Sequence, residues 1–320
     1  MDRRDFLKTG AALALMGAAT KVIGQVQTDK VESAAKAVSA DGMPDIVAVR
    51  GGLPVPMFDR AMAELGGMGK FVKKGQVVTV KPNIAWDQPP AMAANTNPEL
   101  IARIVRACFE AGASKVQVFD TPCNFWKNTY KNSGIAEAAE KAGATVVGGD
   151  AAKDEKYIHD YYVETPVPKG RLLQKVMLHK FIKECDVLIN VPILKVHGGA
   201  TMTCCMKNLM GTVSKEYHQL FHRTGLTRCI AECASVRPPD LNIVDAYRVM
   251  TKRGPRGVDE TDVKELKYLM VGKDLVALDT AAAKLLQLPV RKIEYLAEGV
   301  DLGLGTTNLE SLNIKRVVLS

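Results

Sequence analysis

The sequence has few aromatic residues and no long apolar run. Phe, Trp and Tyr make up 6% of its 320 residues. A transmembrane helix needs roughly 20 consecutive apolar residues. The apolar run near the N-terminus, residues 10–19, is too short and too rich in Gly and Ala for this. We therefore expect no stable membrane insertion of the mature chain.

A concentrated block of basic residues is also missing. The formal net charge is +8, and removing residues 1–24 takes away four Lys/Arg and two Asp/Glu, which lowers it to +6. The remaining charge is spread along the chain with few aromatic residues beside it. Nucleic-acid-binding domains carry their basic residues in one patch or stripe. We therefore expect no nucleic acid partner and interpret the charge as a solvated surface with an anion site.

The cysteine pattern excludes two further classes. There are seven cysteines, and an odd number cannot form a complete set of disulfides within one chain. No C-x2-C-x2-C run occurs, so the ligand set of a ferredoxin-type iron–sulfur module is missing. We therefore expect the cysteines to be small buried side chains or, at most, ligands of a metal.

The N-terminus has the features of an export signal. Arg3 and Arg4 precede Phe-Leu-Lys and a mild apolar stretch, and this order resembles the twin-arginine type. We expect a signal peptide over residues 1–24, a polar tether over residues 25–43, the twin-arginine translocase as a partner and a periplasmic location. Because this route carries folded proteins, a cofactor inserted before export is a natural expectation.

From residue 45 onward, apolar runs alternate with amphipathic stretches. Continuous Val/Ile runs separated by helical patterns predict an α/β fold, a mostly parallel sheet with helices on both faces. We expect a single domain over residues 44–320 with an insertion near 150–180, where the periodicity lapses. The predicted strands are residues 45–50, 76–83, 114–120, 144–149, 185–195, 241–246, 266–272 and 314–320, and the clearest helices are 97–113, 133–144 and 274–286.

Polar residues stand at the ends of four predicted strands. Ligands bind at the carboxyl ends of strands in open α/β sheets, and pockets collect convergent polar groups. We therefore predict one shared site. The strand-end residues are Lys81 and Asn83, then Asp120, Thr121 and Cys123, then Lys195 and His197, and finally Asp245.

Three blocks resemble those of the "domain of unknown function 362" family. They are "VTVKPN" with the helix that follows it, "CDVLINVPILKVHGGATMTCCMKNLMGTV", and "LNIVDAYRVM" followed by "VGKDLVALDTAAAKLL". Members of that family are often associated with iron–sulfur proteins, and some carry ferredoxin modules, which this chain lacks. The resemblance implies an α/β fold and a shared site, and it implies no particular reaction.

The segment from Asn190 to Gly211 predicts an anion site. Two glycines after His197 let the backbone approach a ligand closely, and residues 201–209 are expected to begin a helix whose free N–H groups favour an anion. The anion-binding residues predicted here are Lys81, Asn83, Lys207 and Asn208. Alternatively, Lys207 and Asn208 simply close the helix.

Histidines suggest a metal as well. His218 and His222 are spaced i, i+4, so a helix places both rings on one face. With Cys204 as a third ligand, imidazole and thiolate suit a transition metal such as iron or zinc, or an iron–sulfur cluster. A solvated surface pair is the alternative.

Two functions remain open from the sequence. One is a metal- or cofactor-dependent enzyme that acts on a small anionic substrate in a redox-associated pathway, with His197, Lys195 and Asp245 as catalytic residues. The other is a non-catalytic metal or iron–sulfur binding or maturation partner of a periplasmic redox complex. The two classes differ in whether the predicted site binds an anionic substrate.

Overall fold

The computed structural model describes residues 42–148 and 158–319. The predicted signal peptide with Arg3 and Arg4, and nearly all of the predicted tether, lie outside these residues. Within the described ranges, no helix combines the length and the apolar character that a membrane crossing requires.

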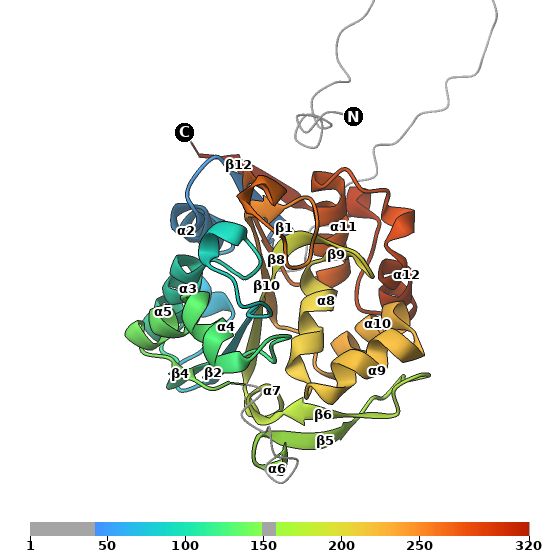
Figure 1. The fold of residues 1–320 in the computed structure, drawn as a ribbon. Helices are drawn as coiled ribbons and strands as arrows, with labels where there is room; N and C mark the ends of the chain where they lie inside the picture. The colour runs from blue at the N-terminus through green and yellow to red at the C-terminus, as the bar shows by residue number, and fades with distance from the viewer. Residues whose placement is uncertain (1–41, 149–157, 320) are drawn as a thin grey trace, which may run out of the picture.

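A ten-stranded sheet forms the centre of the fold (Figure 1). Its main path runs β12-β1-β11-β10-β7-β2-β3-β4, and β8 pairs with β10 and β9. Most neighbours are parallel, whereas β11 is antiparallel to both β1 and β10. The strands are β1 (Ile46–Arg50), β2 (Val77–Pro82), β3 (Lys115–Val118), β4 (Thr145–Val146), β7 (Val187–Val191), β8 (Ile193–His197), β9 (Thr201–Thr203), β10 (Leu241–Met250), β11 (Val263–Gly272) and β12 (Ile314–Val318).

Helices cover both faces of this sheet, as the sequence predicts (Figure 1). One face carries α2 (Pro54–Glu64), α3 (Pro98–Glu110), α4 (Trp126–Asn132) and α5 (Ile135–Lys141). The other carries α8 (Cys205–Asn208), α9 (Glu216–Thr224), α10 (Leu226–Val236), α11 (Leu275–Leu285) and α12 (Glu294–Asp301). A separate apolar core fills each of the two interfaces. The predicted fold class is therefore confirmed.

The segment between β4 and β7 contains a small second sheet. Strands β5 (Tyr162–Pro166) and β6 (Lys175–His179) pair antiparallel and are flanked by α6 (Ile158–Tyr161) and α7 (Lys180–Glu184). This is the region where the sequence predicts an insertion. Glu232 on α10 accepts hydrogen bonds from the backbone N–H groups of Arg171, Leu172 and Leu173. That carboxylate fixes the β5–β6 connection to the helical layer.

Three local predictions differ from the structure. The predicted strand 185–195 is divided into β7 and β8 at Pro192, which has no N–H for a ladder. Strand β10 continues to Met250 instead of ending near Asp245. Residues 201–203 form strand β9, so the helix predicted to start at Thr201 begins at Cys205.

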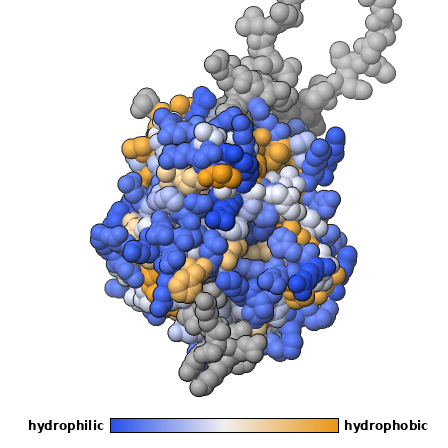
Figure 2. All heavy atoms as spheres, in the orientation of Figure 1, coloured by the Kyte–Doolittle hydropathy of each residue, from blue (hydrophilic) through white to orange (hydrophobic). Residues whose placement is uncertain are grey.

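The surface drawn in Figure 2 is mostly hydrophilic, with apolar side chains in separate patches. The exposed large apolar residues among those described are likewise scattered along the chain: Leu53, Phe125, Leu172, Leu220, Val258, Val300 and Val318. Single exposed apolar residues are normal on soluble domains. The polar cavity of the molecule is more informative about function than these scattered apolar residues.

Candidate functional site

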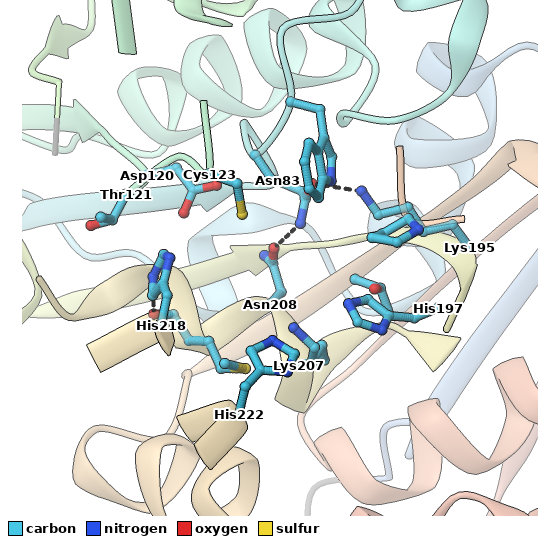
Figure 3. A pocket seen from close by; sticks show the side chains of 16 residues that line it. Asn83, Asp120, Thr121, Cys123, Lys195, His197, Lys207, Asn208, His218 and His222 are labelled. Atoms are coloured by element: carbon cyan, nitrogen blue, oxygen red, sulfur yellow. Dashed lines mark hydrogen bonds between the residues drawn. The ribbon is translucent and has the colours of Figure 1, made fainter. Parts of the chain in front are cut away.

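A cavity of about 280 Å³ opens at the carboxyl edge of the parallel strands (Figure 3). The lining residues come from the loops just after β2 and β3, from the end of β8, and from α8 and α9. Parallel strands direct their carboxyl ends to one edge, and this explains why residues far apart in sequence meet here. The lining residues that carry polar side chains are Asn83, Trp86, Asp120, Thr121, Cys123, Lys195, His197, Thr203, Lys207, Asn208, His218 and His222.

Asp120 is the one carboxylate among the described residues that line the cavity, and it is already paired. Its Oδ1 lies 2.6 Å from Lys81 Nζ, and both side chains are buried. Its Oδ2 accepts the backbone N–H of Ile84 at 2.6 Å. Gly211 packs against the pair so closely that an added Cβ would lie 1.9 Å from Asp120 Oδ1. The pair therefore contributes almost no net charge to the cavity.

Lys195 is buried on β8 with its ammonium held in place. Its Nζ donates to Asn83 Oδ1 at 3.1 Å and to the backbone carbonyl of Ala94. Burial lowers the pKa of Lys195 to about 7, and the charge of Lys207 acts in the same direction. An amine with this pKa changes between its charged and neutral forms near neutral pH, whereas an exposed lysine stays charged.

Lys207 differs from the other two lysines. It lines the cavity from α8, is only partly exposed, and has no hydrogen-bond or ion-pair partner among the described residues. Burial is the main cause that lowers its pKa. A partly desolvated cation without a counter-charge is costly unless a ligand supplies one. Lys207 is therefore the group best placed to bind an anion.

A chain of buried amides fixes one wall of the cavity. Asn83 Nδ2 donates to Asn208 Oδ1, Asn208 Nδ2 to Asn190 Oδ1, and Asn190 Nδ2 to Asn242 Oδ1, all at 2.8–2.9 Å. Because each amide is oriented by the next, Asn83 keeps its carbonyl oxygen toward Lys195. Asn190 and Asn242 were missed from the sequence. Their signal is a polar residue within an otherwise apolar strand, where burial requires a partner.

His197 is a neutral side chain at the end of β8. Its Nδ1 accepts the backbone N–H groups of Gly199 at 3.0 Å and Ala200 at 3.1 Å, so the ring proton resides on Nε2. Burial lowers the pKa of His197 to about 3, and Lys207 and Lys195 add to the effect. The ring can donate a hydrogen bond from Nε2, but it is a poor acceptor of a second proton at neutral pH.

His218 and His222 line the cavity from one face of α9, as their spacing predicts. His218 Nε2 lies 3.1 Å from the carbonyl oxygen of Met210, so it carries the proton and Nδ1 keeps its lone pair. Burial lowers the pKa of His218 to about 4 and also lowers that of His222. Both rings are therefore neutral at pH 7, the form in which imidazole binds a metal.

Two residues predicted for the site do not line it. Asp245 lies within β10 opposite Ile193, because that strand continues past it, and its oxygens accept the N–H groups of Asn97 and Tyr247. It caps the start of α3 and supports a bulge, so placing it in the catalytic pocket was wrong. Lys81 lies behind the wall, where it neutralises Asp120 and does not line the cavity.

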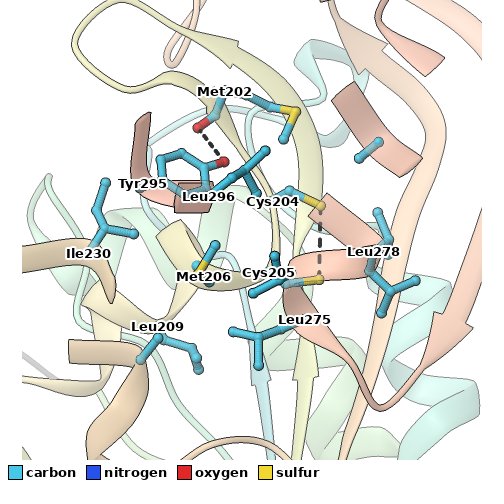
Figure 4. Close-up of a cluster of buried hydrophobic side chains, with 14 of the residues drawn as sticks. Met202, Cys204, Cys205, Met206, Leu209, Ile230, Leu275, Leu278, Tyr295 and Leu296 are labelled. Atoms are coloured by element: carbon cyan, nitrogen blue, oxygen red, sulfur yellow. Dashed lines mark hydrogen bonds between the residues drawn. The ribbon is translucent and has the colours of Figure 1, made fainter. Parts of the chain in front are cut away.

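Cys204 is also displaced from its predicted position. It is buried in the apolar core, where its Sγ lies 4.0 Å from Cys205 Sγ (Figure 4). With Asp279 these two form the one group of three potential ligand atoms within 4.8 Å of one another among the described residues. A joint site of Cys204 with His218 and His222 is therefore wrong.

Asp279 also changes the interpretation of helix α8. Its oxygens accept the backbone N–H groups of Cys205 at 2.6 Å and Met206 at 3.1 Å. The N-terminus of α8 thus already binds an anion, a buried carboxylate from α11. The predicted anion site on these N–H groups is wrong, whereas the side chains of Lys207 and Asn208 do reach the cavity.

Several lining residues had no binding or catalytic role predicted from the sequence. Asp120, Thr121 and Cys123 belong to the predicted strand-end site, and they do line the cavity. Thr121 Oγ1 lies 2.9 Å from Tyr162 Oη, which links the cavity to β5. Trp86 carried no periodic signal, because it lies in the loop after β2. The thiol of Cys123 is solvent-exposed at the mouth of the cavity.

A curated protein is similar to this chain over most of its length. The thylakoid-associated protein sll1697 of Synechocystis sp. is 30% identical over 256 residues, which covers 77% of this chain and 74% of that protein. Among solved structures, the lactate racemase apoprotein of Thermoanaerobacterium thermosaccharolyticum matches with a TM-score of 0.42 at 14% identity. A Thermotoga maritima protein matches with a TM-score of 0.46 at 12% identity. This chain aligns over 73% and 75% of its length, and covers 56% and 60% of those chains.

The family comparison agrees with the sequence blocks that frame the cavity. The model of the family described as "Domain of unknown function (DUF362)" matches residues 78–284. That range includes β2, β3, β8, α8 and α9, which supply most of the lining residues. The chain belongs to the DUF362 family.

Proposed function

We propose that the protein is an enzyme that binds a small organic anion in the cavity through Lys207. The observation that carries this proposal is the Lys207 ammonium, which lines the cavity with no counter-charge among the described residues. Lys195 adds a second positive charge, and the Asp120 carboxylate is neutralised by Lys81. The cavity is thus cationic, and a carboxylate is the complementary ligand.

Lys195 is the residue best suited to proton transfer on the bound anion. An efficient acid or base has a pKa near the working pH, and the pKa of Lys195 is lowered to about 7. The pKa values of His197 and His218, lowered to about 3 and about 4, make both rings weak bases. His197 then serves as a neutral Nε2–H donor that stabilises developing negative charge. Asn83 orients the Lys195 ammonium.

A thermal-shift screen tests this function directly. A ligand that binds only the folded chain raises the melting temperature with its concentration. We expect small mono- and dicarboxylates to stabilise the protein, and matched amides or alcohols without charge to have no effect. A screen in which neutral analogues stabilise as well as carboxylates would contradict the proposal.

Anion affinity should fall as pH rises through 7. Lys195 is protonated, and therefore positive, below its pKa of about 7, and loses that charge above it. We expect the dissociation constant of a carboxylate to increase roughly fivefold between pH 6.5 and 8.5, since about 1 kcal/mol of attraction is lost. Isothermal titration measures this change. The Lys195→Met variant should bind more weakly with a flat profile, and a flat profile for the unaltered protein would refute the role of Lys195.

We further propose that His218 and His222 bind a transition metal, iron or zinc, when the protein is isolated without oxygen. The support is two neutral rings on one helix face beside the cavity. A His218→Ala, His222→Ala variant should lose bound metal, measured by elemental analysis, while its melting temperature changes little. Equal metal content in the variant would leave the pair as ordinary surface residues.

The non-catalytic alternative predicts a different elemental result. An iron–sulfur carrier or maturation partner of a redox complex would contain iron with acid-labile sulfide and would not be stabilised by carboxylates. Iron–sulfur content together with a negative carboxylate screen would therefore favour that role over the enzyme.

Export by the twin-arginine translocase to the periplasm is also part of the proposal, with Arg3 and Arg4 as its basis. Replacing both by Lys should leave the precursor in the cytoplasm, because the paired arginines are the distinguishing feature of this signal type. Cell fractionation and immunoblotting measure the distribution. A variant with one substitution in the predicted tether, Lys30→Gln, serves as the control. Unchanged export of the double-Lys variant would overturn the assignment.

A further inference from the structure

A second, larger hollow adjoins the cavity and shares lining residues with it. Its volume is about 530 Å³, and it is lined by Cys123, Lys215, His218, Gln219, His222 and Arg223. Three of these residues, Cys123, His218 and His222, also line the inner cavity, where Figure 3 labels them, so the two hollows share a wall. We call the larger one the outer basin. Together they provide more room than a small monocarboxylate fills.

One face of helix α9 forms the floor of the outer basin. The lining positions 215, 218, 219, 222 and 223 recur at intervals of three and four, the spacing of one helix face. Lys215 precedes the first turn of α9 and Arg223 lies in its last turn. They are about 12 Å apart along the helix axis at 1.5 Å per residue. The neighbouring carboxylate, Glu216, accepts a hydrogen bond from the Ser214 hydroxyl and does not line the basin.

Charge is distributed unevenly along this combined site. The inner cavity holds Lys195 and Lys207, with its carboxylate neutralised. The outer basin holds Arg223 and Lys215, of which Lys215 also has a protein interaction of its own, and no Asp or Glu is among the described residues that line it. The shared wall of Cys123, His218 and His222 is uncharged when the rings are neutral, and the pKa of each His is lowered by burial. Positive charge therefore stands at both ends, with a neutral middle.

We propose that the substrate carries two anionic groups, one bound in the inner cavity and the other in the outer basin. This inference rests on the proposed function, because Lys207 binds the first group. Arg223 binds the second group, a carboxylate or a phosphate, and Lys215 adds to the positive charge of the basin. Clefts lined by one sign of charge favour ligands of the opposite sign, and Arg suits both groups through its paired N–H donors. The neutral wall accommodates the uncharged connecting chain.

Matched ligand pairs test the inference by isothermal titration. The probes are butyrate against succinate and glutarate, hexanoate against adipate, and glycerate against 3-phosphoglycerate. We expect the best dianion to bind about tenfold more tightly than its monoanionic partner, with an optimum chain length. In a Lys215→Gln, Arg223→Gln variant this ratio should fall to about twofold or less. Lys264→Gln, an exposed residue that lines neither hollow, is the control and should keep the ratio.

The outcomes separate this inference from the proposed function. If mono- and dianions bind the unaltered protein equally and Lys207→Gln weakens both, the two-anion inference is overturned and the proposed function stands. If the dianion advantage survives in the Lys215→Gln, Arg223→Gln variant, the outer basin is not the second subsite. If binding of every probe is independent of Lys207, or no probe binds, the proposed function fails and the inference with it.

Discussion

Replacing Lys207 with Gln is expected to weaken carboxylate binding roughly 30-fold, while the protein remains folded. The hydrogen bond and charge contact between an ammonium and an anion in a partly desolvated cavity contribute about 2 kcal/mol. No protein group among the described residues depends on Lys207 for a partner. Isothermal titration of the tightest carboxylate from the screen, with the variant and the unaltered chain side by side, measures the loss.

The melting temperature of the Lys207→Gln variant supplies the control for folding. Burial lowers the pKa of Lys207, so the folded state disfavours its charge, and removing it should leave stability unchanged or raise it. Weaker binding with equal or higher stability is the signature of a functional residue. Equal affinity in the two proteins would place the anion elsewhere.

The Asp120→Asn substitution is expected to have the largest effect on stability. It leaves the buried Lys81 ammonium without its counter-charge, and breaking a buried ion pair in this way costs about 3–5 kcal/mol. Asn retains an oxygen for the Ile84 N–H, so the loss reports mainly on the pair. Urea unfolding followed by circular dichroism measures the change in the free energy of unfolding.

Two comparisons make this result specific. The double variant Lys81→Met, Asp120→Asn removes the stranded charge, and it should recover part of the lost stability. The exposed pair of Glu137 and Lys141 is the matched control, and Glu137→Gln should have little effect, because both side chains are well solvated. A small loss for Asp120→Asn, similar to that for Glu137→Gln, would contradict the buried pair as a stabilising element.

The fold was predictable because its signal is repeated in every strand. Runs such as Val77–Val80 and Val187–Val191 are mostly apolar on both faces, and only a sheet covered on both sides buries them. Lengths were less predictable. Strand β10 extends to Met250 through a bulge after Ala246, and pairing with β11 sustains it where its own sequence becomes more polar. That tertiary pairing is not visible in a local pattern.

Site residues were predictable where a strand ends at its predicted position, because ligands bind at the carboxyl ends of strands in such sheets. Asn83 follows β2, and Lys195 and His197 finish β8, and all three line the cavity. Asp245 failed because its strand continues. Lys81 failed for a different reason: its buried ammonium is paired with the Asp120 carboxylate, and it is not among the residues that line the cavity. Sequence alone does not reveal which polar groups satisfy one another.

Cys204 and helix α8 also show that the sequence does not reveal which polar groups pair with one another. The sequence places two thiols beside a helix start, which suggests a ligand set and a free N-terminus. Asp279, more than seventy residues later, occupies both N–H groups and lies against the thiols. Such long-range capping depends on how α11 packs against α8, and packing of this kind is fixed only in the folded chain.

A crystal structure of the protein with its tightest-binding carboxylate would locate the bound anion. We expect the ligand carboxylate within hydrogen-bond distance of Lys207 Nζ, inside the cavity formed after β2, β3 and β8. Clear density for the ligand outside this cavity, with Lys207 uninvolved, would contradict this expectation.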